Sequence, residues 1–294
     1  MKKLILFLSL ILSVGFASAQ SEIPSDSIRR APSSNIKEFG GFLLDMGLMN
    51  VATALNRKYL LYTGVMLTSL CENNPCHIDI YILHSELTDT DIQRLTECVD
   101  KYDISIHPLY IEKDKFEGKM YTDKMWSIEA YYRLMLLDIL PSNVKRMFYF
   151  DVDIIVNKSL EDFYNINFEG NDLAACEDDC GNCVPEHYGP MHKKIFGSEK
   201  LRNHRYFNSG VLLLNIEQMR HKYNYKYYMK IAKDVWNYKM EAPDQDILNY
   251  VHYDSVKYVP FEIYNLFARI AYYCDIKYET LRDKISIIHY AWYK

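Results

Sequence analysis

The stretch Arg146–Asn157, RMFYFDVDIIVN, places two aspartates inside a run that otherwise has the composition of a fully buried strand. A buried carboxylate is destabilising unless it is paired or binds a metal. Because side chains alternate faces along a strand, Asp151 and Asp153 should point the same way and repel each other. A divalent cation with oxygen ligands, Mg²⁺ or Mn²⁺, would relieve this repulsion. Alternatively, one aspartate caps a helix formed by SLEDFY, residues 159–164, and the other is solvated.

Strand and helix patterns alternate on both sides of this stretch. We expect strands at 49–55, 77–85, 104–111, 171–179, 206–216 and 283–294, and helices at 59–74, 88–102, 127–141 and 245–253. Alternation at this spacing is typical of a mainly parallel sheet flanked by helices. The sequence therefore predicts an α/β fold that binds ligands at the carboxyl ends of its strands.

The first 19 residues have the anatomy of a secretory signal peptide. Two lysines precede an apolar stretch, and Ala17-Ser18-Ala19 offers a cleavage site. We expect a polar tether at residues 20–48 and one α/β domain at residues 49–294. A cleaved leader predicts export, and an uncleaved leader would attach the protein to a membrane. If translation instead starts at Met49, the protein would be cytoplasmic.

Charge and cysteine content narrow the function further. The formal net charge of −5 and the pI near 6.0 argue against general nucleic-acid binding. Seven cysteines leave one unpaired in any intrachain disulfide framework. Cys176, Cys180 and Cys183 form the one cluster. They could bind zinc, with His187 as a nearby ligand, form one disulfide, or stay as thiols.

Several motifs, in order along the chain, resemble those of the retaining glycosyltransferases of family 8. They are NVATALNRKYLLYTGVMLTSL, SIEAYYRL, FYFDVDIIV, YFNSGVLLLNI, PDQDILN and IIHY, and together they extend from residue 50 to residue 290. The resemblance implies a GT-A fold and a sugar-nucleotide donor, usually a UDP-sugar. It also implies Mn²⁺, with Mg²⁺ as an alternative, held by Asp151, Asp153 and His289. A bound cation would stabilise the charge that develops on the leaving diphosphate.

The resemblance also implies roles for individual residues. Asp178 would hydrogen-bond hydroxyls of the donor sugar, and Asp244 and Gln245 would lie beneath that sugar, with Gln245 nearest the anomeric carbon. Arg133 would lie near the phosphates and the sugar. An amide is a poor nucleophile, which favours front-side substitution over a covalent intermediate. The residues implied in donor binding are Ala54, Asn56, Tyr59, Arg133, Asp151, Val152, Asn208, Ser209 and Lys294.

Each of these residues also has a structural interpretation. Arg133 could be an exposed helix residue, and His289 a buried structural histidine. Asp244 could cap and charge the first turn of its helix. Gly210, which follows Asn208 and Ser209, could mark a simple bulge. The motif order favours the site over these alternatives.

The sequence departs from the family pattern at both ends of the domain. An acidic position in the family opening is Asn56 here, and Arg57 and Lys58 follow it, so we expect altered base contacts and added positive charge near a diphosphate. The chain ends at Lys294, without the glycine and the Lys-Pro-Trp motif that usually follow the histidine.

We expect transfer of a hexose, glucose or galactose, to a glycan such as lipopolysaccharide. The alternative is a weak or silent protein of the same fold that binds a glycan or a nucleotide.

Overall fold

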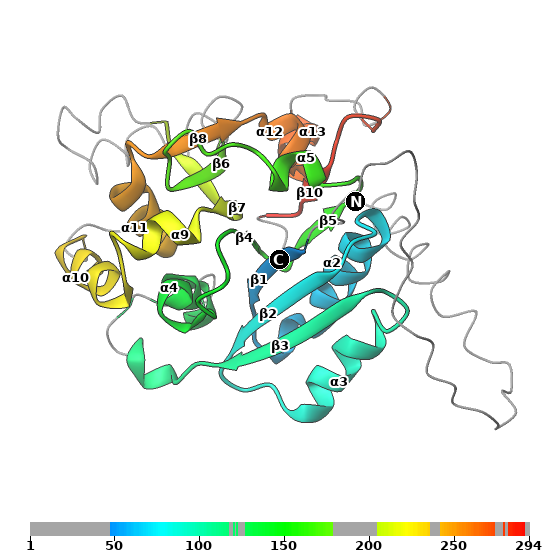
Figure 1. The fold of residues 1–294 in the computed structure, drawn as a ribbon, viewed down its shortest axis with the longest axis horizontal. Helices are drawn as coiled ribbons and strands as arrows, with labels where there is room; N and C mark the ends of the chain where they lie inside the picture. Colours follow the sequence, from blue (N-terminus) through cyan, green and yellow to red (C-terminus); the bar gives the residue numbers. More distant parts are fainter. Residues whose placement is uncertain are drawn as a thin grey trace, which may run out of the picture. The chain divides into compact units, whose positions relative to one another are not determined.

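The structure is a computed structural model, and it describes residues 48–117, 120, 122, 127–178, 205–235, 242–273, 279 and 282–291. Within these residues the strands form two sheets. The large sheet has the order β3-β2-β1-β4-β7-β6-β8, and the small sheet has the order β5-β10-β9. Neighbouring strands of the large sheet are parallel except where β7 meets β4 and β6. Figure 1 shows the strands running through the molecule with helices packed around them.

The large sheet contains β1 (Met49–Ala54), β2 (Ile78–His84), β3 (Ile104–Tyr110), β4 (Met147–Phe150), β6 (Leu173–Glu177), β7 (Phe207–Leu214) and β8 (Val256–Val259). The small sheet contains β5 (Ile154–Val156), β9 (Leu266–Phe267) and β10 (Ile287–His289). The α-helices are α2 (Leu60–Asn73), α3 (Asp89–Glu97), α4 (Leu136–Ile139), α5 (Glu161–Tyr164), α9 (Ile216–Arg220), α10 (Tyr225–Val235), α11 (Pro243–His252), α12 (Phe261–Tyr264) and α13 (Ala268–Tyr273). Short 3₁₀ helices cover Arg57–Tyr59, Lys113–Lys115 and Ile128–Met135.

Both faces of the large sheet are buried, which explains why its central strands are apolar throughout. Met147 and Tyr149 of β4 pack into one hydrophobic cluster with residues of α4, α10 and α11. Phe148 and Phe150 pack into the other, with residues of α2 and α5. The alternation of side chains along one strand therefore supplies two cores, as expected for a sheet covered on both sides. Figure 1 shows α2 and α3 on one side of the picture and α4, α10 and α11 on the other.

The prediction of one strand through Arg146–Asn157 is wrong. β4 ends at Phe150, and β5 begins at Ile154 in the other sheet. A continued strand would carry the carboxylates into the apolar clusters. The chain instead leaves the large sheet, and the Asp151 and Asp153 side chains stay 31% and 19% exposed. Neither aspartate caps α5, whose N-cap is Leu160.

Other elements differ from the prediction in extent. The helix expected at 127–141 begins as a 3₁₀ helix and becomes α-helical only from Leu136. The last strand is limited to Ile287–His289. Helix α3 begins with the expected capping, because Thr88 and Asp91 form a reciprocal capping box. The sequence patterns did not predict α9, α10, α12, α13, β8 or β9.

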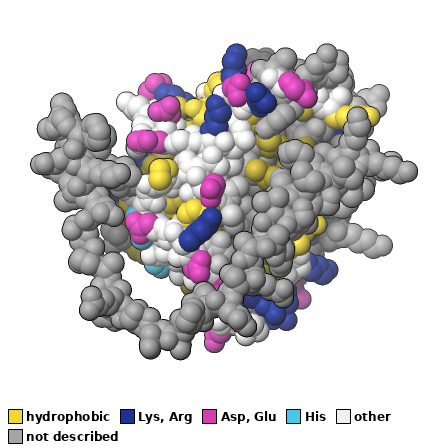
Figure 2. Space-filling model, turned by 90° about the vertical axis from the view of Figure 1, so that its right-hand side faces the viewer, with side chains coloured by type: hydrophobic (Ala, Val, Ile, Leu, Met, Phe, Trp, Pro, Cys, Tyr) yellow, Lys and Arg dark blue, Asp and Glu magenta, His cyan; other side chains and the backbone are white. Residues whose placement is uncertain are grey.

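The surface of the described part gives one further observation. Acidic and basic side chains are interspersed on the face shown in Figure 2. Among the described residues, none of the helices combines the length and apolarity needed to cross a bilayer.

Candidate active site

A cavity of about 260 Å³ opens at the carboxyl ends of the parallel strands. β1, β4 and β6 each end at it, and the antiparallel β7 begins there, so residues from four strands meet at one edge of the sheet. The sequence-predicted residues that line it are Ala54, Asn56, Tyr59, Arg133, Asp151, Val152, Asp153, Asp178, Asn208, Ser209, Asp244, Gln245 and His289. Lys294 lies outside the described residues.

Asp151, Asp153 and His289 offer one ligand atom each, and these three atoms all lie within 4.8 Å of one another. The small sheet makes this possible, because His289 on β10 pairs with Ile154 on β5, directly after Asp153. The Asp153 carbonyl also accepts a hydrogen bond from the Tyr290 amide at 2.8 Å. Two carboxylates and an imidazole are a suitable donor set for Mn²⁺.

Gly210 has no side chain, and this leaves room for the candidate metal ligands to converge beside it. A Cβ at this position would lie 2.4 Å from His289 Cε1 and 2.7 Å from Asp151 Oδ2. The Gly210 carbonyl also accepts the Asp151 amide at 2.8 Å, which fixes the turn that leads out of β4. The close approach of backbone to two candidate ligands therefore requires glycine here. The residues present fit a divalent cation.

His289 is buried, and its Nε2 lies 3.3 Å from Asp153 Oδ1. Burial by itself lowers the pKa of the imidazole, but the hydrogen bond to Asp153 and the charges of Asp153, Asp151 and Asp178 outweigh it and raise the pKa. Its Nδ1 lies 2.9 Å from Asn265 Oδ1. The three carboxylates therefore favour a positive charge on or beside the His289 ring.

Arg133 is not a surface residue, because its side chain is only 6% exposed. Its guanidinium donates to Asp151 Oδ1 at 2.8 Å and to the Ser209 carbonyl at 2.7 Å, and its Nε lies 3.2 Å from Asp244 Oδ2. The guanidinium also stacks over the Tyr149 ring, 4.1 Å from the centroid. Burial raises the pKa of Asp244, and the nearby Arg133 opposes this rise. The Arg133 guanidinium thus links Asp151, a candidate metal ligand, to Asp244 in the first turn of α11.

Gln245 is held by three hydrogen bonds at the start of α11. Its Oε1 accepts from the Ser209 amide at 2.8 Å and from Asn208 Nδ2 at 3.1 Å, and its Nε2 donates to Asp178 Oδ2 at 2.9 Å. All four residues are buried. The amide plane of Gln245 is therefore fixed in orientation at the edge of the cavity.

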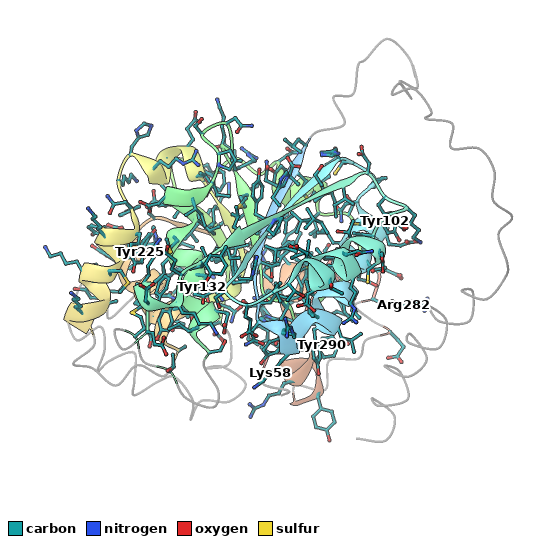
Figure 3. All side chains as sticks on the ribbon, turned by 90° about the horizontal axis from the view of Figure 1, so that it is seen from below. Lys58, Tyr102, Tyr132, Tyr225, Arg282 and Tyr290 are labelled. Carbon is teal, nitrogen blue, oxygen red and sulfur yellow. The ribbon has the colours of Figure 1, made fainter. Side chains whose placement is uncertain are left out.

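Asn56 lines the other end of the cavity, and the two basic residues Arg57 and Lys58 follow it in the chain. Asn56 donates to Glu129 Oε2 at 3.2 Å and accepts from the Lys58 amide at 3.1 Å. The Arg57 guanidinium pairs with Asp91 at 2.9 Å. Neither Arg57 nor Lys58 lines the cavity, and Lys58 lies near the lower edge of the ribbon in Figure 3. Asp91 on α3 therefore offsets the charge of Arg57, and both basic side chains lie outside the lining of the cavity.

Sequence reasoning missed three residues of this region. Glu129 is 5% exposed and lines the cavity beside Asn56, Tyr149 supports Arg133, and Asn265 contacts His289. Glu129 could have been found from the sequence, because it is a glutamate inside an apolar helical pattern. The cysteine cluster is only partly described: the Cys176 thiol is free and buried, whereas Cys180, Cys183 and His187 lie outside the described residues.

The model of the glycosyl transferase family 8 matches residues 50–292 of this chain. The chain belongs to glycosyl transferase family 8. The family that the motifs predicted is thereby confirmed, and its members are enzymes that transfer sugars.

Curated relatives agree with the family. A putative glycosyltransferase of Haemophilus influenzae is 28% identical over 211 residues, which cover 72% of this chain and 61% of that protein. A lipopolysaccharide 1,2-glucosyltransferase of Escherichia coli is 26% identical over 253 residues, covering 82% of this chain and 71% of the relative. The chain thus spans between three fifths and three quarters of the length of these two proteins.

Solved structures confirm the fold. The galactosyltransferase LgtC in complex with donor and acceptor sugar analogues superposes with a TM-score of 0.68 at 23% identity, covering 83% of this chain and 87% of that chain. The mainly parallel sheet flanked by helices is therefore a GT-A fold, as the sequence predicted.

Proposed function

We propose that this chain is a metal-dependent retaining glycosyltransferase that moves a hexose, glucose or galactose, from a UDP-sugar to a glycan acceptor. The observation that carries the proposal is the convergence of Asp151, Asp153 and His289 in the cavity that also holds Arg133 and Gln245. A glycan such as lipopolysaccharide is the acceptor we infer. The names of the E. coli relative and of a lipopolysaccharide 1,3-galactosyltransferase of Salmonella typhimurium support this choice.

Asp151, Asp153 and His289 would hold Mn²⁺, or Mg²⁺ in its place. When bound, the cation would supply charge stabilisation to the diphosphate as it leaves. Arg133 would orient the donor phosphates, since it is fixed by two carboxylates and by the Tyr149 ring. Ala54, Val152 and Tyr59 would line the donor, with Asn56 and Tyr59 beside its nucleoside part.

Asp178, Asn208 and Ser209 would orient the hexose above Gln245. The side chain of Gln245 is an amide whose two polar atoms are already bonded, so it is unsuited to attack the anomeric carbon. We infer that the acceptor hydroxyl bonds to this carbon on the face from which the diphosphate departs. The bond between carbon and phosphate oxygen breaks, and the hydroxyl proton passes to the departing phosphate. The configuration at the anomeric carbon is thereby retained.

Release of UDP from UDP-glucose and from UDP-galactose, with and without Mn²⁺, tests this function. We expect Mn²⁺-dependent release that Asp153→Asn abolishes. Binding of UDP and Mn²⁺ without turnover across a panel of donors would instead support a silent binding protein of the same fold. Calorimetric titration of UDP, GDP and ADP tests the base, and tighter binding of GDP or ADP would exclude a UDP-sugar as donor.

A further inference from the structure

A continuous chain of side-chain hydrogen bonds runs from Asp178 to His289 through three amide residues. Gln245 donates to Asp178, Asn208 donates to Gln245, and Asn265 donates to Asn208. These three contacts measure 2.9, 3.1 and 2.9 Å. The last contact joins Asn265 Oδ1 to His289 Nδ1 at 2.9 Å. All five side chains are buried, the least exposed being Asn265 at 1% and His289 at 2%.

The direction of these bonds follows from chemistry. An ionised carboxylate only accepts hydrogen bonds, so Gln245 must turn its NH₂ group to Asp178 and its oxygen to Asn208. Two backbone amides fix the same orientation, because the Ser209 amide donates to Gln245 Oε1 at 2.8 Å and the Gly210 amide donates to Asn208 Oδ1 at 2.9 Å. The NH₂ group of Asn208 then faces Gln245, and its oxygen accepts from Asn265.

Asn265 is oriented by the same rule. Its NH₂ group donates to Asn208 Oδ1, so its oxygen is the atom that faces His289 Nδ1. An amide oxygen cannot donate, and therefore Nδ1 must carry the hydrogen. This holds whether the ring is neutral or protonated. In the neutral ring it leaves Nε2, beside Asp153, as the nitrogen whose lone pair can bind a cation.

We propose that Asn265 is a positioning residue that fixes His289 with a hydrogen on Nδ1, so that Nε2 is available to a divalent cation. This positioning role rests on the proposed function, because that function supplies the cation that His289 would bind. Asn265 acts through the ring of His289, and it does not line the cavity. It follows α12 directly and precedes β9, which pairs with β10 at Phe267 and His289. The same small sheet thus holds the histidine and the residue that orients it.

The first experiment compares Mn²⁺ binding by calorimetry in the wild-type chain and in Asn265→Leu, which keeps the branched shape of the side chain without its polar atoms. Loss of a residue that orients a ligating histidine typically weakens metal binding by about 10- to 100-fold, and we expect a loss in this range. Asn74→Leu is the matched control. Asn74 is also a buried asparagine with two side-chain hydrogen bonds, to Leu70 and Leu160, and it lies outside the cavity. This variant should lose stability and bind Mn²⁺ with wild-type affinity.

A second measurement needs no variant. In a chain labelled with ¹⁵N-histidine and assigned with His289→Gln, we expect the His289 Nδ1 signal of a protonated nitrogen, with and without diamagnetic Mg²⁺. An unprotonated Nδ1 overturns the proposal, and so does wild-type Mn²⁺ affinity in folded Asn265→Leu. If the wild-type chain binds no Mn²⁺ at all, the proposed function fails instead, and the state of Nδ1 still tests the positioning role separately.

Discussion

Arg133 Nη2 donates to Asp151 Oδ1 over 2.8 Å, so a buried cation neutralises one of the two carboxylates that are predicted to bind the metal. The same guanidinium lies 3.2 Å from Asp244. The arginine therefore holds two carboxylates from distant parts of the chain near each other. Its removal should affect both the stability of the fold and the balance of charge at the metal ligands.

We predict that Arg133→Met lowers the free energy of unfolding by about 3 kcal/mol, because breaking a buried pair leaves a carboxylate without its partner. UDP binding should weaken, whereas Mn²⁺ binding should be no weaker, since Asp151 loses a competing cation. Arg133→Lys should restore stability only in part, because an ammonium lacks the planar fork. Urea denaturation and calorimetry measure these effects.

Arg205→Met is the control for Arg133. Arg205 pairs with Glu177 at 2.7 Å, but both side chains are more than a third exposed. The expected loss is below about 1 kcal/mol. A large loss of Mn²⁺ affinity in Arg133→Met would mean that the arginine builds the cation site and does not compete for it.

Gly210→Ala should weaken Mn²⁺ binding at least about tenfold, because the added methyl group would displace the side chains of His289 and Asp151. Gly64→Ala in α2 is the control. Its Cβ would lie 3.3 Å from Cys98 Sγ, far less crowded than at Gly210, and it lies outside the cavity. Calorimetric titration with Mn²⁺ distinguishes the two, and equal affinity in both variants would show that the carboxylates and the imidazole tolerate the shift.

Glu129→Gln should weaken UDP binding about tenfold, the loss expected for one hydrogen bond to a charged group. A buried carboxylate at the nucleoside end can accept from the N3–H group of uracil, whereas N3 of cytosine carries no hydrogen. An amide can donate to cytosine, so the preference for UDP over CDP should narrow in this variant. Calorimetry with both nucleotides measures the ratio.

Glu86→Gln is the matched control for Glu129. The Glu86 carboxylate bonds to Arg57 and Lys113 outside the cavity. Its UDP affinity should equal that of the wild-type chain. An unchanged ratio of UDP to CDP in Glu129→Gln would remove Glu129 from base recognition.

The buried pair Asp172–His252 should make the protein less stable in acid. Burial raises the pKa of Asp172, but hydrogen bonds from His252, Lys222 and Gln218 outweigh it and hold this pKa well below its usual range. Burial lowers the pKa of His252, more than Asp172 raises it. Both groups therefore bind protons more readily in the unfolded chain.

The direction of the pH effect on stability follows from this difference in proton binding between the folded and the unfolded chain. As the pH falls below about 6.5, the unfolded chain takes up a proton on His252, and below about 3.9 it takes up another on Asp172. The free energy of unfolding should thus fall with falling pH, by up to about 1.4 kcal/mol per pH unit for each proton. Urea denaturation from pH 7 to pH 2 measures the slope.

Two variants separate this pair from the remaining ionisable groups. Asp172→Asn should be destabilised by about 3 kcal/mol at pH 7, because Lys222 and His252 lose their charged partner. Asp79→Asn should cost less than about 1 kcal/mol, because Asp79 pairs with partly exposed histidines. Below about pH 3.9, a slope in Asp172→Asn equal to that of the wild-type chain would assign this part of the acid sensitivity to groups other than Asp172.

Much of the fold could be read from local patterns. The alternation of apolar runs and amphipathic segments predicted β1, β2, β3, β6, β7, α2, α3 and α11, because period and capping depend on residues close in sequence. The break between β4 and β5 could not be read this way. Val152 and the flanking apolar residues fit a continuous strand, and only the pairing with Gly210 and with β10 divides it.

The sequence by itself determined the family, the order of the elements in the first half of the domain up to β3, and most of the charged and amide residues that meet in the cavity, since these are carried by local motifs. Only the tertiary structure decided how the residues are partnered. His289 reaches Asp153 through a sheet that joins β5 to β10, Arg57 turns to Asp91, and Asn265 orients His289 from a segment without a recognisable motif. The physical reason is that these contacts join residues far apart in the chain. Which of them form depends on strand pairing and on the need of each buried polar group for a partner.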